Sequence, residues 1–219
     1  MFSDVIDLIL KVLISYLLGS VIGSLLVGRL RGGVDIRTMA SGNAGATNAL
    51  RTQGKGFAFW VLLIDIAKGW LATAVVARLA FVDPLVGGPW QLWAASLCGI
   101  AVMAGHIFPL WYGFRGGKGV ATLVGVILGL QPALLLPVLV TWLLAAILFG
   151  YVGLASIIAA ASLPIAVAMT SAEPHVPLLT FAVVAFVAIV LTHRKNIARM
   201  RSGTEPRARR LWLFGKGRA

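Results

Sequence analysis

The sequence carries very little charge. Of its 219 residues, 12% are Asp, Glu, Lys or Arg, and 59% are hydrophobic. A soluble domain usually has about 25% charged residues, so this composition excludes an ordinary soluble protein and indicates that lipid is the solvent for much of the chain. No internal repeat is evident, which weighs mildly against many transporter folds. We expect one integral membrane domain over residues 1–219, of which residues 194–219 form a basic cytoplasmic tail.

Acidic residues and cysteine are also scarce. The chain has 7 Asp and Glu and a single cysteine, Cys98, which excludes an internal disulfide, and no zinc or iron–sulfur spacing is present. Asp65 is the only aspartate deep in a predicted helix, so the aspartate cluster of a metal-dependent CDP-alcohol phosphotransferase is missing. No Ser-His-Asp pattern or reactive cysteine is evident either. A covalent intermediate on a nucleophilic side chain is therefore not predicted.

Basic residues, in contrast, are plentiful. The 19 Lys and Arg give a formal net charge of +12, which in a soluble protein would suggest nucleic acid. Here they lie in short stretches between apolar runs, as the positive-inside rule predicts for cytoplasmic loops. We expect no nucleic-acid partner. The basic residues that topology does not explain should meet an anionic substrate.

Long apolar runs predict an all-α membrane bundle. A spanning helix needs about 20 mostly apolar residues, and the runs do not alternate as barrel strands do. The candidate spans are 5–28, 57–81, 91–112 and 176–192, with a longer apolar region at 120–171. The first run has no basic segment before it and no cleavage site after it, so it is predicted to be a helix and not a signal peptide.

The distribution of Lys and Arg predicts the orientation. The loops at 30–56 and 113–119 and the tail from Arg194 are basic and are expected inside, whereas 83–90 and 172–175 lack Lys and Arg and are expected outside. The region 120–171 must then cross an odd number of times. Three short spans, with breaks at Gln131-Pro132 and Gly150-Tyr151, give about seven helices with the N-terminus outside and the C-terminus inside. A single crossing with re-entrant pieces is the alternative.

Two glycine-containing loops could bind anions. The first loop offers backbone and side-chain donors from Ser41, Gly42, Asn43, Gly45, Thr47 and Asn48, and Arg51 follows it. The second, Gly116-Gly117-Lys118-Gly119, enters a helix that carries Thr122, and helix N-termini favour anions. It is not a nucleotide P-loop, because the required spacing is absent. The alternatives are a turn with a helix N-cap at Ser41 or Thr47, and a basic loop that serves only topology.

Other polar residues stand in or beside the predicted spans. Asp65 and Lys68 are three residues apart and share a helix face. Charged residues at that depth are usually paired or functional, so they could equally form a structural ion pair or part of a functional site. His193, Asn196 and Arg199 share another face at the end of the last span, and Ser156 gives only a weak signal. All these groups are expected at the cytoplasmic side, which favours an enzyme over a transporter or a non-catalytic scaffold.

Three motifs resemble one known family. The segments SGNAGATNALR at 41–51, GHIFP with FRGGKGVAT over 105–122, and HRKNIARMRSGTE at 193–205 are similar to motifs of the bacterial acyl-phosphate:glycerol-3-phosphate acyltransferases. The resemblance runs from about residue 19 to 205. Two positions depart from it, since Ala40 and Gly153 stand where the family usually has Gly and Ser.

This resemblance implies a reaction and roles for the residues. Acyl phosphate and sn-glycerol 3-phosphate would give lysophosphatidic acid and phosphate at the cytoplasmic face of the bacterial inner membrane, by direct attack and without metal or cofactor. A monomer surrounded by membrane lipids is compatible with the sequence. The expected catalytic residues are Ser41, Arg51, His106, Lys118, His193 and Asn196, with His106 a general base or an organiser. The expected binding residues are Gly42, Asn43, Gly45, Thr47, Asn48, Lys68, Gly116, Gly117, Gly119, Thr122, Ser156, Arg194, Arg199 and Glu205.

Overall fold

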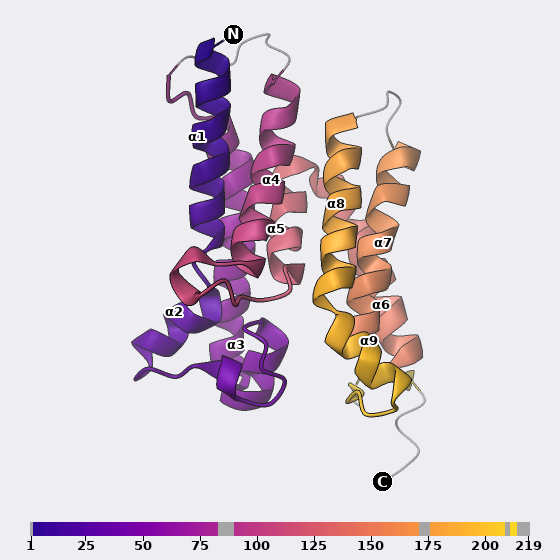
Figure 1. Cartoon of the computed structure of the whole chain (residues 1–219). Coiled ribbons are helices and arrows are strands. Elements are labelled where there is room, and N and C mark those ends of the chain that lie inside the picture. The colour runs from indigo at the N-terminus through magenta and orange to yellow at the C-terminus, as the bar shows by residue number, and fades with distance from the viewer. Residues whose placement is uncertain (1, 83–89, 171–175, 209–210, 214–219) are drawn as a thin grey trace. The chain divides into compact units, whose positions relative to one another are not determined.

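The computed structural model describes residues 2–82, 90–170, 176–208 and 211–213, and the regular structure in these ranges is helical (Figure 1). The chain forms two compact units, residues 1–130 and residues 131–219, which are considered separately. Of the segments 83–90 and 172–175, which are expected on the outer side of the membrane, all but residue 90 fall outside the described residues.

Helices α1 (Phe2–Gly19) and α4 (Gln91–Ile107) pack together in the first unit. Their contact depends on two glycines: a Cβ on Gly19 would collide with the carbonyl of Val102, and one on Gly105 would collide with the carbonyl of Tyr16. Small residues let helix backbones approach closely, which is how membrane helices gain packing energy. After a short break, the chain turns by 49° into α2 (Gly23–Leu30).

A second helix pair completes the first unit. Helix α3 (Ala46–Trp70) bends at Gly54, where φ is +82°, and continues through a π turn at Leu71–Val75 and a 3-10 turn at Val76–Arg78. The shorter α5 (Val120–Leu130) packs on α3. A Cβ on Gly69 or Gly125 would strike the backbone of the opposite helix, so this contact is close as well.

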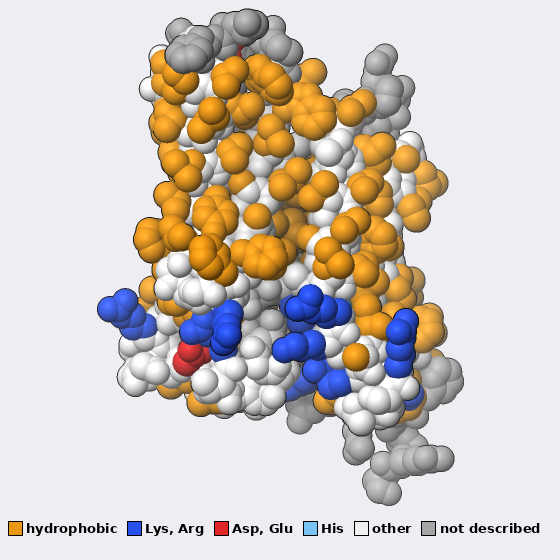
Figure 2. All heavy atoms as spheres, viewed as in Figure 1, with side chains coloured by type: hydrophobic (Ala, Val, Ile, Leu, Met, Phe, Trp, Pro, Cys, Tyr) orange, Lys and Arg blue, Asp and Glu red, His pale blue; other side chains and the backbone are white. Residues whose placement is uncertain are grey.

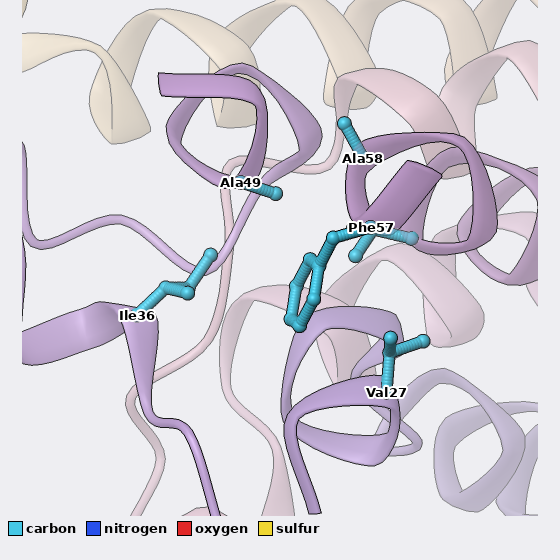
Figure 3. Packing of buried hydrophobic residues seen from close by; sticks show 6 residues of the cluster. Val27, Ile36, Ala49, Phe57 and Ala58 are labelled. Carbon is cyan, nitrogen blue, oxygen red and sulfur yellow. The ribbon is translucent and has the colours of Figure 1, made fainter. Parts of the chain in front are cut away.

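A small apolar core sits beneath the first glycine-containing loop. Val27 of α2, Ile36 of the 3-10 turn Ile36–Thr38, and Ala49, Phe57 and Ala58 of α3 converge there, with the Phe57 ring lying among the others (Figure 3). Phe57 is 1% exposed and Ile36 is fully buried. Burying an aromatic side chain of this size stabilises the fold by about 1.5–3 kcal/mol. The core therefore gives the loop between α2 and α3 a fixed base.

The second unit is built around α7. Helix α7 (Val152–Thr170) contacts both α6 (Leu135–Phe149), which follows the 3-10 turn Pro132–Leu134, and α8 (Val176–Thr192). Helix α9 (Arg194–Arg201) leaves α8 at an angle of 52°. The segment after α9 folds back on the start of α7: the Ala208 amide donates to the Gly150 carbonyl at 2.7 Å, and the Arg207 guanidinium stacks on Tyr151 and Trp212.

The predicted breaks at Gln131-Pro132 and Gly150-Tyr151 are confirmed, because α5 ends at Leu130 and α6 ends at Phe149. In the described ranges four helical segments are long and apolar enough to span a membrane, or six if each bent pair is one span. Helix α5 has 11 residues, about 16 Å at 1.5 Å per residue, which is less than the roughly 30 Å of a bilayer core. The count of seven crossings thus stays a prediction.

Surface chemistry follows the same pattern in each unit. Figure 2 shows apolar side chains over the long helices, and Lys and Arg gathered at the end of the first unit that carries α2 and at the end of the second that carries α9. Among the exposed apolar residues are Phe108, Trp111 and Phe114, which follow α4. Trp and Tyr are enriched where a membrane meets water, so the exposed Trp111 fits a position at the interface.

Candidate functional site

The first glycine-containing loop is organised by Asn48. Its Oδ1 accepts from the Ser41 amide at 3.2 Å and from Ser41 Oγ at 3.0 Å, and its Nδ2 donates to the carbonyls of Ile36 and Met39 at 2.9 and 3.1 Å. Asn48 is 1% exposed. An amide side chain offers two acceptor and two donor positions, so the protein itself fills those of Asn48. This residue shapes the loop and places Ser41.

The helix after this loop begins without a side-chain cap. Gly45 is the N-cap of α3, so neither Ser41 nor Thr47 is the cap considered from sequence. Thr47 and Arg51 lie four residues apart near the start of α3 and are exposed, and Asn43 is half-buried beside Gly45. An Arg one turn from a helix start presents a guanidinium fork suited to phosphate.

The conformation of the loop explains one departure from the family pattern. Ala40 has φ of +45° and Gly42 has φ of +69°. Only glycine adopts the left-handed region at no steric cost, and another residue there costs roughly 1–2 kcal/mol. The glycine that the family pattern usually has at the Ala40 position therefore has a backbone reason.

The second loop differs from the sequence prediction in an informative way. The amides of Gly116 and Gly117 donate to the carbonyls of Ile107 and His106 at 3.1 and 3.0 Å, so these two N–H groups point back to α4 and are not available to an anion. A Cβ on either residue would collide with His106 or its carbonyl. The glycines are thus needed for close packing, and the predicted anion site is reduced to Lys118 and the start of α5.

The residues at the start of α5 are partly or fully buried. Lys118 is half-buried, and Gly119 has φ of +85°. Thr122 is fully buried, and its Oγ1 has no hydrogen-bond partner among the described residues. Since a buried hydroxyl without a partner is costly, Thr122 is the one expected binding residue at this helix start whose side chain the protein leaves unsatisfied.

A buried charged cluster lies next to this loop. Lys68 Nζ is 2.9 Å from Asp65 Oδ1 and 2.8 Å from His106 Nδ1, and it donates to the carbonyls of Gly19 and Val21 at 3.0 and 2.8 Å. The three side chains are each no more than 3% exposed. The predicted Asp65–Lys68 pair is therefore present, and it includes His106, which the spacing did not predict.

An ion pair outside the spans joins the two loops. Arg37 binds Asp35 through Nε and Nη2, the latter at 2.7 Å, and its Nη1 donates to the carbonyls of Tyr112 and Arg115 at 3.2 and 3.1 Å. The Arg37 hydrogen bond lowers the pKa of Asp35, and Asp35 raises the pKa of Arg37. The sequence did not predict this pair, whose signal there is an Asp and an Arg two residues apart just before the first glycine-containing loop.

The second unit contributes a cluster centred on Glu205. Its carboxylate accepts from Asn196 Nδ2 and from Arg199 Nε, each at 2.6 Å, so these two side chains converge as their spacing predicted. Glu205 is 8% exposed, and a carboxylate that bridges two donors is an organiser more than a ligand for an anion. The Arg199 side chain remains 33% exposed.

His193 and Gly153 border this cluster. His193 stands at the bend between α8 and α9, with Nδ1 at 2.8 Å from the Ile189 carbonyl, which orients the ring. A Cβ on Gly153 would lie 3.0–3.1 Å from the Asn196 side chain, so a serine in relatives requires Asn196 to shift. The hydroxyl of Ser156 donates to Val152 and accepts from Trp142 within the unit, and Arg194 is exposed.

Comparison with known proteins identifies the family. The family model described as "Glycerol-3-phosphate acyltransferase" matches residues 9–203, which include all three polar motifs except the last two residues of the third. The chain belongs to the glycerol-3-phosphate acyltransferase family. A glycerol-3-phosphate acyltransferase of Mesorhizobium japonicum is 43% identical over 198 residues, covering 90% of this chain and 94% of that protein. One from a Synechococcus strain is 42% identical and covers 93% and 96%.

Solved structures of a family member agree with the fold. PlsY (YgiH), an integral membrane glycerol 3-phosphate acyltransferase crystallised in a glycerol 3-phosphate form, has a TM-score of 0.78 and 34% identity over 91% of this chain and 94% of its own. Its lysophosphatidic acid form gives 0.77 and 33%. The resemblance derived from the motifs is thereby confirmed, and this acyltransferase chain is an integral membrane protein.

Proposed function

We propose that this protein transfers a fatty acyl group from acyl phosphate to the 1-hydroxyl of sn-glycerol 3-phosphate and produces lysophosphatidic acid and phosphate. The observation that carries this proposal is the match over 91% of the chain to an acyltransferase crystallised in forms named for glycerol 3-phosphate and lysophosphatidic acid. The donor is inferred from the family resemblance and from the absence of any patterned nucleophile in the sequence.

The chemistry needs no enzyme-bound intermediate, because acyl phosphate is an activated mixed anhydride. The glycerol hydroxyl oxygen attacks the acyl carbon, a new ester C–O bond forms, and the C–O bond to phosphate breaks. The hydroxyl proton leaves with the departing phosphate. Under this scheme the protein contributes positioning and stabilisation of developing negative charge.

The residues divide by the group they serve. Ser41 and Arg51, near the start of α3, and Lys118, before α5, are proposed to bind the acyl-phosphate group, with Thr122 as a further donor. His193 and Asn196, oriented by Ile189 and Glu205, are proposed to orient glycerol 3-phosphate, and Arg194 and Arg199 to neutralise its phosphate. Asn48, Ser156 and Glu205, whose polar atoms bind the protein itself, are proposed to shape these surfaces.

The location follows from the charge distribution. We place the protein in the bacterial cytoplasmic membrane, with its polar clusters facing the cytoplasm and about seven crossings. Reporter fusions after Gly87 and after Gly203 should then report opposite sides of the membrane. Two cytoplasmic reports would overturn the parity argument.

A donor assay tests the reaction. Purified protein in mixed micelles should convert palmitoyl phosphate and glycerol 3-phosphate to lysophosphatidic acid, and palmitoyl-CoA should give no product. Turnover should persist in excess EDTA. Product from palmitoyl-CoA alone would overturn the proposed donor, and loss of turnover on chelation would point to a metal-dependent site.

A further inference from the structure

The most unusual polar group in the first unit is the buried ammonium of Lys68. It comes from the last turn of α3 and is 3% exposed. Within 3.0 Å it meets the carbonyls of Gly19 and Val21, at the break between α1 and α2, and also Asp65 Oδ1 and His106 Nδ1. One side chain therefore links the end of α1, the start of α2, α3 and α4.

The hydrogen-bond donors and acceptors around Lys68 determine which ring nitrogen of His106 carries a proton. An ammonium has three N–H donors and no lone pair, and these donors are shared among four neighbours: the carbonyls of Gly19 and Val21, Asp65 Oδ1 and His106 Nδ1. Because a charged Lys68 cannot accept, a proton on His106 Nδ1 at 2.8 Å would face one of its N–H groups, so Nδ1 must be the unprotonated ring nitrogen. A neutral Lys68 would leave the Asp65 carboxylate, 1% exposed, with only a protonated His106 as its cation, at 3.4 Å from Nδ1 to Oδ1. Lys68 Nζ is closer to the same oxygen, at 2.9 Å, and a buried carboxylate needs a close cation, so the charge belongs on Lys68. His106 is then neutral, with its lone pair on Nδ1 and its proton on Nε2.

The other ring nitrogen faces the loop that carries Lys118. A Cβ on Gly117 would collide with His106 Nε2, so this atom lies directly against the Gly117 backbone. The His106 carbonyl also accepts the Gly117 amide at 3.0 Å, and the next carbonyl, of Ile107, accepts the Gly116 amide. His106 thus holds the two residues before Lys118 with both its ring and its backbone.

We propose that Asp65 and Lys68 are positioning residues that fix His106 as the neutral tautomer protonated on Nε2, and that His106 in this form sets the geometry of the Gly116–Gly119 loop. Lys68 accordingly does not bind substrate. His106 is not the general base, because Nδ1 is occupied by Lys68 and Nε2 already carries a proton. The expected effect on turnover rests on the proposed function, whereas the tautomer does not.

Nitrogen NMR reads the tautomer directly. The chain has 3 His, so full-length protein labelled with ¹⁵N-histidine in micelles gives few signals, and His106→Gln assigns the relevant pair. We expect a protonated, pyrrole-type Nε2 and an unprotonated Nδ1 for His106 near pH 7. A proton on Nδ1, or a doubly protonated ring, would overturn the proposal whether or not the protein turns over palmitoyl phosphate.

Variants test the link between tautomer and loop. Because Lys68→Met removes the nearest cation of the buried Asp65, the double variant Asp65→Asn with Lys68→Met is the cleaner test. It should mix the two tautomers and lower kcat on the order of 10-fold, as removal of an orienting partner typically does, with a smaller change in KM. Asp7→Asn with Lys11→Met, at the other buried pair of the unit, is the matched control and should leave kcat and the tautomer unchanged.

A pair of substitutions at His106 separates its two nitrogens. The amide of Gln reaches the position of Nε2 and keeps a donor beside Gly117, whereas the amide of Asn ends near Nδ1 and keeps only the contact with Lys68. His106→Gln should therefore retain more turnover than His106→Asn at equal thermal stability. Equal turnover in the two variants, or an unchanged tautomer and kcat in the Asp65–Lys68 double variant, would overturn the positioning role.

Discussion

Two buried Asp–Lys pairs occur in the first unit, and they differ in the other groups that their side chains contact. Lys11 Nζ lies 2.6 Å from Asp7 Oδ2, and both side chains are at most 3% exposed, as are Asp65 and Lys68. The first pair contacts backbone groups, since Asp7 Oδ1 accepts from the amides of Phe81 and Val82 at 2.7 and 3.3 Å. The second pair contacts the side chain of His106, whose ring lies against Gly117 in the Gly116–Gly119 loop.

This difference shows that a buried ion pair has no function in itself. Removing one partner of such a pair is strongly destabilising, whereas replacing both is often tolerated. The pair at Asp7 fastens α1 to the segment after the last turn of the α3 region. The pair at Asp65 has the same chemistry but transmits its geometry to a loop that carries a proposed catalytic cation. Variants that separate stability from turnover test this contrast.

The largest effect is expected at the loop that the second pair supports. Lys118→Ala should lower kcat by about 100- to 1,000-fold, the usual cost of removing a donor aimed at developing charge, with little change in thermal stability. Lys118→Arg should be impaired too, because a planar fork does not replace a compact ammonium. Rate constants and melting curves of the purified variants decide the matter. Near-normal turnover of Lys118→Ala would show that this lysine serves only to orient the chain in the membrane.

The converse pattern is expected at the first pair. Lys11→Met leaves Asp7 as an unpaired buried charge and should destabilise the protein by about 3–5 kcal/mol, while kcat of the folded fraction stays normal. Asp7→Asn with Lys11→Met should recover most of this loss. Chemical unfolding in detergent and assays below the melting temperature measure the two quantities. A fall in kcat with intact stability would remove the distinction between the pairs.

A smaller, pH-dependent effect is expected at the half-exposed pair Asp35–Arg37. Because Arg37 lowers the pKa of Asp35 below 3.8, the pair stabilises the fold above about pH 4 and this contribution is lost as the pH falls through the lowered pKa. Its size should stay below about 1 kcal/mol, since exposed pairs are screened. Melting temperatures of wild type and Asp35→Asn should differ at pH 6 and converge as the pH falls through the lowered pKa of Asp35. A constant difference would exclude titration of Asp35 as the cause.

The smallest effect is expected at Ala40. Its φ of +45° carries a steric cost that glycine avoids, and the greater freedom of unfolded glycine offsets part of the gain. Ala40→Gly should stabilise the protein by roughly 0.5 kcal/mol with unchanged turnover. Ala67→Gly, in the regular part of α3, is the matched control and should destabilise by up to about 1 kcal/mol. The same sign in both variants would contradict the backbone explanation.

The amino-acid sequence by itself determined the class of the protein, the breaks near Gln131 and Gly150, and the family, because hydrophobic length, Pro and Gly punctuation and motif order are properties of the linear chain. It also paired Asp65 with Lys68 and Asn196 with Arg199, since helical spacing is local. Only the tertiary structure decided that Lys68 meets His106, that Arg37 clamps the loop before Gly116, and that the amides of Gly116 and Gly117 point to α4. These contacts join residues that are distant in sequence, and close helix packing, which no local pattern encodes, sets them.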